Sequence, residues 1–112
     1  METLLVLTNL PDEAAARALA GELVERRLAA CVNILAPCRS VYRWQGRVEE
    51  AGEVPLLIKT CAARYADLEA AIRERHPYEL PEIVAVPLAQ GLPAYLAWVA
   101  DETRAPPPDT SC

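Results

Sequence analysis

The stretch Ser40-Val41-Tyr42-Arg43-Trp44-Gln45-Gly46-Arg47 decides the fold of this chain of 112 residues. Gln45-Gly46 predicts a tight turn, because glycine readily takes the positive φ that short hairpin turns require. An extended, apolar-rich segment over 29–44 precedes the turn, and another over 47–61 follows it. We therefore expect a long β-hairpin whose first strand bends or bulges at Pro37, since proline interrupts the hydrogen-bond ladder of a strand.

The segments that flank this hairpin predict one strand and one helix on each side. The apolar run over 3–8 indicates a buried strand, and the helical spacing of apolar residues after Pro11 indicates a helix. After the hairpin we expect a helix over 63–75, a strand over 83–88 and a third helix over 94–103.

This order, βαββαβ with one further helix, predicts an α+β, ferredoxin-like fold. Such a fold is a four-stranded antiparallel sheet with helices on one face, here with an extra C-terminal helix and a long hairpin between the second and third strands. We expect one domain over 1–104 and a disordered, proline-rich tail over 105–112.

Composition narrows the classes of partner. The net charge of −5 argues against nucleic-acid binding, which needs a basic surface. The sequence shows neither a secretory leader nor an apolar run of about 20 residues, so we expect a cytoplasmic protein with no membrane contact. The four cysteines should then be mostly reduced thiols, and their spacing contains no C-x-x-C pair that would indicate structural zinc.

The strands are apolar on both faces, which predicts self-association. The runs over 4–7, 56–58 and 83–86 lack the alternation of a sheet with one wet face. A first hairpin strand reaching about 50 Å would also carry Tyr42 and Trp44 beyond a small domain. These two aromatic side chains could contact a neighbouring subunit, or only stabilise the hairpin through cross-strand packing.

The stretch His76-Pro77-Tyr78-Glu79-Leu80-Pro81-Glu82-Ile83 predicts a stiff corner between a helix and a strand. Both prolines fix their own φ and bias the preceding residue away from helix. The corner should therefore hold its tyrosine and its carboxylates in set directions, which is typical of a site.

Five segments in register resemble the CutA family of divalent-cation-tolerance proteins, between about residue 3 and residue 102. They are LAACVNI (28–34), SVYRWQG (40–46), Glu53 with LIKT (57–60), HPYE (76–79) with 81–83, and Gly91 with 95–98. The resemblance implies a ferredoxin-like, PII-like homotrimer built through sheet edges and hairpins. It also implies a role in the response to copper and other divalent metal ions, and no enzymatic activity.

Four residues are candidates for binding copper or another divalent metal: His76, Cys31, Cys61 and Glu82. One bulge in the hairpin would bring Cys31 opposite Cys61, where two thiolates suit Cu(I), although buried cysteines also pack as small apolar side chains. The imidazole of His76 suits copper, but a histidine at a helix end also suits the negative pole of the helix dipole.

Five further residues are candidates for an inter-subunit cleft that binds a small anion or polar metabolite: Trp44, Glu53, Lys59, Tyr78 and Glu79. Alternatively Lys59, the only lysine, forms a structural ion pair with a carboxylate. We expect Asn33, inside an apolar strand, to be a hydrogen-bonded core amide.

The sequence shows no nucleophile–base pair and no phosphate-binding loop, so we expect no enzyme. It favours a homotrimer that binds divalent metal and acts in metal tolerance. The alternative is a PII-like sensor that binds a small molecule at inter-subunit clefts, with only indirect effects of metals.

Overall fold

The computed structural model describes residues 2–105 and has the predicted ferredoxin-like α+β architecture. Its strands are β1 (Thr3–Leu10), β2 (Cys31–Ile34), β3 (Cys38–Trp44), β4 (Arg47–Cys61) and β5 (Val84–Pro87). Its helices are α1 (Glu13–Glu25), the 3-10 helix η1 (Ala62–Arg64), α2 (Tyr65–Arg75) and α3 (Pro93–Glu102). The predicted disordered tail lies outside the described residues, except for Ala105.

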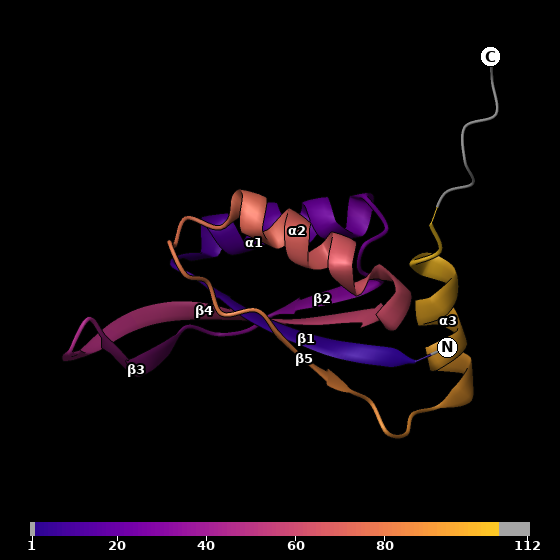
Figure 1. Ribbon diagram of the computed structural model, residues 1–112. Coiled ribbons are helices and arrows are strands. Elements are labelled where there is room, and N and C mark those ends of the chain that lie inside the picture. The colour runs from indigo at the N-terminus through magenta and orange to yellow at the C-terminus, as the bar shows by residue number, and fades with distance from the viewer. Residues whose placement is uncertain (1, 106–112) are drawn as a thin grey trace, which may run out of the picture.

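All strand pairs are antiparallel, in the order β2-β4-β1-β5, and β3 pairs with the remaining half of β4. Helices α1 and α2 lie side by side over one face of the sheet, and α3 lies at the end where β1 begins (Figure 1). No helix within residues 2–105 is long and apolar enough to span a membrane.

Helix α1 has a defined cap at each end. The Asp12 carboxylate accepts a hydrogen bond of 2.8 Å from the Ala15 amide, which satisfies one of the free N–H groups of the first turn. After the helix, Arg27 takes a left-handed φ of 59°, a position where glycine is usual. Its guanidinium donates to the Asp101 carbonyl at 2.8 Å, so the end of α1 is tied to the end of α3.

The hydrophobic core lies between the sheet and helices α1 and α2. Alternate residues of β1 and β4 point into it, and their exposed fractions lie between 0% and 8% for Leu4, Val6, Leu10, Val54, Leu56 and Ile58. Leu19 and Leu23 of α1, with Leu68 and Ile72 of α2, complete this layer. Complete burial of one such side chain contributes about 1.5–3 kcal/mol, so this layer is the main source of stability.

The opposite face of the sheet is also apolar but is only half covered. Leu5 pairs with Val86 and Leu7 pairs with Val84, so these four side chains share this face. The two valines remain 46% and 47% exposed, respectively. We call this surface, made by Leu5, Leu7, Leu57, Val84 and Val86, the open face.

The hairpin turn lies where the sequence predicts it. Trp44 pairs with Arg47, and both Gln45 (φ 48°) and Gly46 (φ 80°) adopt the positive φ of a two-residue hairpin turn. The β3–β4 hairpin projects away from the helices (Figure 1), and Val41 and Val48 on it are each 65% exposed.

The predicted bend at Pro37 is present, but the bulge shifts the register in the unexpected direction. Residues 35–37 lie between Ile34 and Cys38, whereas only residues 54 and 55 lie between their partners. The extra residue therefore sits in the β2–β3 strand, which puts Cys31 opposite Lys59. Cys61 instead pairs with Thr3 of β1, so the predicted opposition of Cys31 and Cys61 is wrong.

Candidate functional site

The corner after α2 is fixed by the ring of His76, which is only 8% exposed. Its Nδ1 accepts a hydrogen bond of 3.2 Å from the Tyr78 amide. Its Nε2 lies 2.6 Å from the carbonyl oxygen of Asn9, and because a carbonyl only accepts, Nε2 carries the proton. Both ring nitrogens are thus engaged, and the arrangement leaves His76 no lone pair for the metal role that we predicted.

Asn9, near the end of β1, holds the corner at a second point. Its side-chain amide donates to the Glu82 carboxylate at 3.3 Å, while its backbone carbonyl accepts from His76. One strand residue therefore binds both ends of the corner that the two prolines stiffen. Glu82, a predicted metal ligand, is an exposed partner of this amide.

Tyr78 and Glu53 are the two predicted cleft residues that the structure brings together. The Tyr78 ring packs on the His76 ring, with 4.7 Å between their centroids. Burial raises the pKa of Tyr78, and the charge and hydrogen bond of Glu53 raise it further. Glu53 is only 9% exposed, whereas the neighbouring Glu79 points into solvent.

Lys59 lies near the other end of β4 and has an amide partner. Its Nζ donates to the Asn33 side-chain oxygen on β2. Among residues 2–105 it forms no ion pair, so the structural pair with a carboxylate that we considered is not formed within one chain. Asn33 is exposed on the sheet and is not the core amide that we expected.

Trp44 is too far from Lys59 to share a site within one chain. It is half-buried beside the hairpin turn, opposite Arg47. The stretch of β4 from Arg47 to Lys59 spans about 40 Å at about 3.3 Å per residue. A cleft that contains both side chains would need two copies of the chain.

The two cysteines predicted as metal ligands have different surroundings. Cys61 is 2% exposed, and its Sγ lies 3.2 Å from the Thr103 hydroxyl, which anchors the end of α3 to the sheet. Cys31 is half-buried, and burial and then the nearby Cys31 raise the pKa of Tyr95, because a thiolate at this position disfavours ionisation of the phenol. Within the described part of the chain, no three His, Cys, Asp or Glu side chains gather as a metal site.

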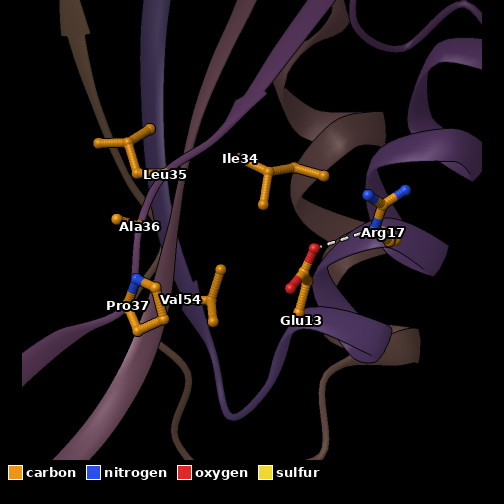
Figure 2. Close-up of a pocket in the computed structure, with 7 residues that line it drawn as sticks. All are labelled: Glu13, Arg17, Ile34, Leu35, Ala36, Pro37 and Val54. Atoms are coloured by element: carbon orange, nitrogen blue, oxygen red, sulfur yellow. Dashed lines mark hydrogen bonds and ion pairs between the residues drawn. The ribbon is translucent and has the colours of Figure 1, made fainter.

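A pocket of about 300 Å³ lies between the start of α1 and the bulge that separates β2 from β3 (Figure 2). Its wall is apolar, and its rim carries the ion pair of Glu13 and Arg17 at 3.1 Å. The apolar lining residues are Ile34, Leu35, Ala36, Pro37 and Val54. No predicted site residue lines this pocket, which lies beside the extra residue of the first hairpin strand.

The chain is similar to known proteins over most of its length, and this similarity shows its family. A family model described as CutA1 divalent ion tolerance protein matches residues 4–102. The chain belongs to the CutA1 family. The Divalent-cation tolerance protein CutA of Thermus thermophilus is 48% identical over 98 residues, which cover 88% of this chain and 95% of that protein.

Solved CutA structures agree with this assignment. A divalent cation tolerance protein (Cut A1) from Thermus thermophilus superposes with a TM-score of 0.89 at 46% identity, covering 91% of this chain and 99% of that one. The structure of the periplasmic divalent cation tolerance protein CutA from Archaeoglobus fulgidus superposes with a TM-score of 0.88 at 31% identity, covering 91% of this chain and 99% of that one.

Within this CutA1 chain, three important site residues were not identified as such from the sequence. Asn9 accepts the hydrogen bond that fixes the corner, Asn33 accepts the hydrogen bond of Lys59, and Tyr95 lies near Cys31. A signal exists for the two asparagines, because each interrupts an apolar strand and its amide needs partners. Tyr95 gives no such signal, since an aromatic residue on a helix is usually a packing residue.

Proposed function

We propose that this CutA1 protein acts in divalent-cation tolerance as a homotrimer, and that it acts by binding and not by catalysis. The observation that carries the proposal is the open face. Its five aliphatic side chains are half-buried or exposed in one chain, and covering each of them contributes up to about 1.5–3 kcal/mol. A second copy supplies a cover of the same apolar character.

We further propose that any copper or other divalent metal is held by donors from more than one copy. Support comes from the dispersal of the predicted ligands within one chain: His76 is engaged at both nitrogens and Cys61 is packed on Thr103. Of the predicted donors, Cys31 remains half-exposed and Glu82 remains exposed. Residues 2–105 of one copy do not gather a set of metal donors, so we propose that the binding step depends on assembly.

Light scattering coupled to size exclusion tests the assembly, with an expected mass of about three times 12.3 kDa. A stable, soluble monomer at micromolar concentration contradicts the homotrimer.

Calorimetry of the reduced protein with Cu(I) and with Cu(II) tests the metal donors. We expect Cys31→Ser to weaken binding by about tenfold or more, because a soft thiolate is lost. Cys61→Ser is the matched control and should bind as the wild type does. No binding by the wild type, or equal effects of both variants, contradicts the proposed donors.

The second candidate function is a PII-like sensor of a small molecule at the inter-subunit clefts. The pairing of Tyr78 with Glu53, and the presence of Lys59 without a carboxylate partner among residues 2–105, favour a polar ligand. A ligand that binds only the folded protein raises the melting temperature. A metabolite screen in the presence of a metal chelator separates this function from metal binding, since only the sensor still responds.

We place the protein in the cytoplasm, and support comes from Cys31, Cys38 and Cys61, which are free thiols. Fractionation of the source cells followed by thiol labelling tests this location. Recovery in an oxidising compartment would contradict it.

A further inference from the structure

Four charged side chains of strand β4 form no ion pair within residues 2–105: Arg47, Glu49, Glu53 and Lys59. Of these, Glu53 is the only buried one, and Lys59 is the only charge on the half of β4 that pairs with β1. The first charge is that of Glu53, a residue that is only 9% exposed. No Lys, Arg or His nitrogen of the described chain lies within 4.0 Å of its carboxylate, and Glu53 lies close enough to the Tyr78 phenol to raise the pKa of that group. A carboxylate removed from water in this way is costly unless a cation compensates it.

The second charge is Lys59, whose side chain has the Asn33 amide as its only hydrogen-bond partner among the described residues. Its neighbours across the sheet are Leu5 on one side and Cys31 on the other, so the ammonium lies on a largely apolar surface. An amide oxygen offers part of the interaction that a carboxylate would give. Lys59 therefore also lacks full compensation in one copy.

The two charges lie on the same face of β4 but cannot reach each other. Side chains alternate between the faces of a strand, so positions 53 and 59 of this continuous strand point the same way. Six residues separate them by about 20 Å, far beyond an ion pair. Glu53 lies where the hairpin begins, and Lys59 lies on the sheet beside the open face.

We propose that Glu53 of one copy forms an ion pair with Lys59 of the next copy. The inference rests on the proposed homotrimer and adds the contact that sets its register. The half of β4 that belongs to the hairpin would lie against the sheet half of β4 in the neighbour, a head-to-tail contact that a ring can repeat. Tyr78 would hold one oxygen of the carboxylate, so that Glu53 is oriented before the neighbour arrives.

Charge reversal tests this pair, with size exclusion and light scattering over a dilution series as the readout. We expect Glu53→Lys and Lys59→Glu each to raise the subunit dissociation constant by about tenfold or more, because like charges then face each other. The double variant E53K/K59E restores the pairing and should return to within about threefold of the wild type. Failure of the double variant to recover, while each single variant remains folded by circular dichroism, overturns the pair.

A mixture of the two single variants shows that the contact joins different copies. Each Glu53→Lys copy carries two lysines at these positions and each Lys59→Glu copy carries two glutamates, so mixed neighbours are complementary in both directions. A ring of three contains at least one contact between like copies, whereas a ring with an even number of copies can avoid such contacts. Recovery of larger assemblies on mixing supports the pair. If the assembly is a trimer, the mixture should recover less than the double variant does. The absence of any recovery overturns it.

Neutral variants keep the test decisive if a reversed charge prevents folding. Glu53→Gln and Lys59→Met should each weaken assembly, and their combination should cost less than the sum, because both remove the same interaction. Glu13→Gln with Arg17→Gln is the matched control, since that ion pair is exposed and formed within one chain. Additive effects in a protein that remains trimeric overturn the pair and leave the trimer intact, whereas a monomeric wild type overturns both.

Discussion

The two faces of the sheet carry similar residues but are covered differently. On the face under α1 and α2, Val6, Leu56 and Ile58 are all 0% exposed. On the open face the neighbouring Leu5, Leu7 and Leu57 are only half-buried, although the same strands provide them. The sheet therefore has two apolar faces, and the helices of the same chain cover only one of them.

This difference indicates that the hydrophobic pattern of the strands suits an assembled protein better than a single chain. A sheet with one permanently wet face should alternate apolar and polar residues, and β1 does not. Polar residues on the open side, such as Lys59 and Asn33, occur next to apolar residues and bind each other. A surface of this composition is typical of a subunit interface.

The largest predicted effect is the difference in stability loss between two alanine variants, one on each face of the sheet. Ile58→Ala removes a fully buried side chain and should lower the free energy of unfolding by about 2–5 kcal/mol at any protein concentration. Leu57→Ala, its neighbour on the open face, should cost less than about 1.5 kcal/mol in dilute solution and more as the protein assembles. Urea unfolding at two protein concentrations measures both, and equal losses for the two variants at both concentrations would contradict the difference between the faces.

Removing the ring of His76 should give the next largest effect. His76→Ala leaves the Asn9 carbonyl and the Tyr78 amide without their partner, which should cost about 1–3 kcal/mol in urea unfolding. The corner that delivers β5 to the open face would then loosen. Glu79→Ala is the control, because this exposed neighbour should change stability by less than about 0.5 kcal/mol. A wild-type stability for His76→Ala would show that the ring does not hold the corner.

Two threonines on the covered face should respond in opposite directions to the same change. The Thr8 hydroxyl is buried and has no hydrogen-bond partner among the described residues, so Thr8→Val should stabilise the protein by about 1 kcal/mol. The Thr60 hydroxyl donates to the Leu28 carbonyl at 2.7 Å, so Thr60→Val should destabilise it by about 1 kcal/mol. Thermal unfolding monitored by circular dichroism compares them, and a shift of the same sign in both variants contradicts this assignment.

The smallest predicted effect is on the alkaline side of the pH profile. Burial and then Glu53 raise the pKa of Tyr78 above its ordinary value of 10.0. The unfolded chain therefore loses this phenol proton first, so the contribution of Tyr78 is complete below pH 10 and is lost as pH rises through the folded pKa. Tyr78→Phe should flatten the loss of stability above about pH 10 in urea unfolding, and Glu53→Gln should flatten it partly. Parallel profiles of wild type and Tyr78→Phe would mean that the phenol is not perturbed.

The order of elements could be predicted from the sequence because local patterns specify it. Gln45-Gly46 defines the hairpin turn, and helical spacing after Pro11 defines α1. The position of the bulge was also predictable from Pro37. The direction of the register shift was not predictable, because either strand of a hairpin can accommodate an extra residue.

The candidate site was predictable where neighbours come from one segment and not where they come from distant strands. The stiff corner is present, and its tyrosine contacts the neighbouring His76 of the same segment; Tyr78 also lies near Glu53, whereas the inter-subunit cleft in which we grouped these two stays a prediction. The partner of His76, by contrast, is a backbone carbonyl of β1, and a backbone group leaves no mark in a sequence. The pairing of Cys61 with Thr3 likewise depends on the sheet register, which one misplaced residue changes for a whole strand.

The length of β4 has a consequence for how the chain folds during synthesis. This one strand of 15 residues pairs with β1, β2 and β3, and the first residue of β1 finds its partner only at Cys61. A nascent chain that has not yet extended past Arg47 holds β1, β2 and β3 with no strand to accept their hydrogen bonds. Contacts between such distant residues form slowly, and unpaired apolar strands are prone to aggregate. The pairing of β1, β2 and β3 into one sheet therefore has to wait until β4 has been synthesised.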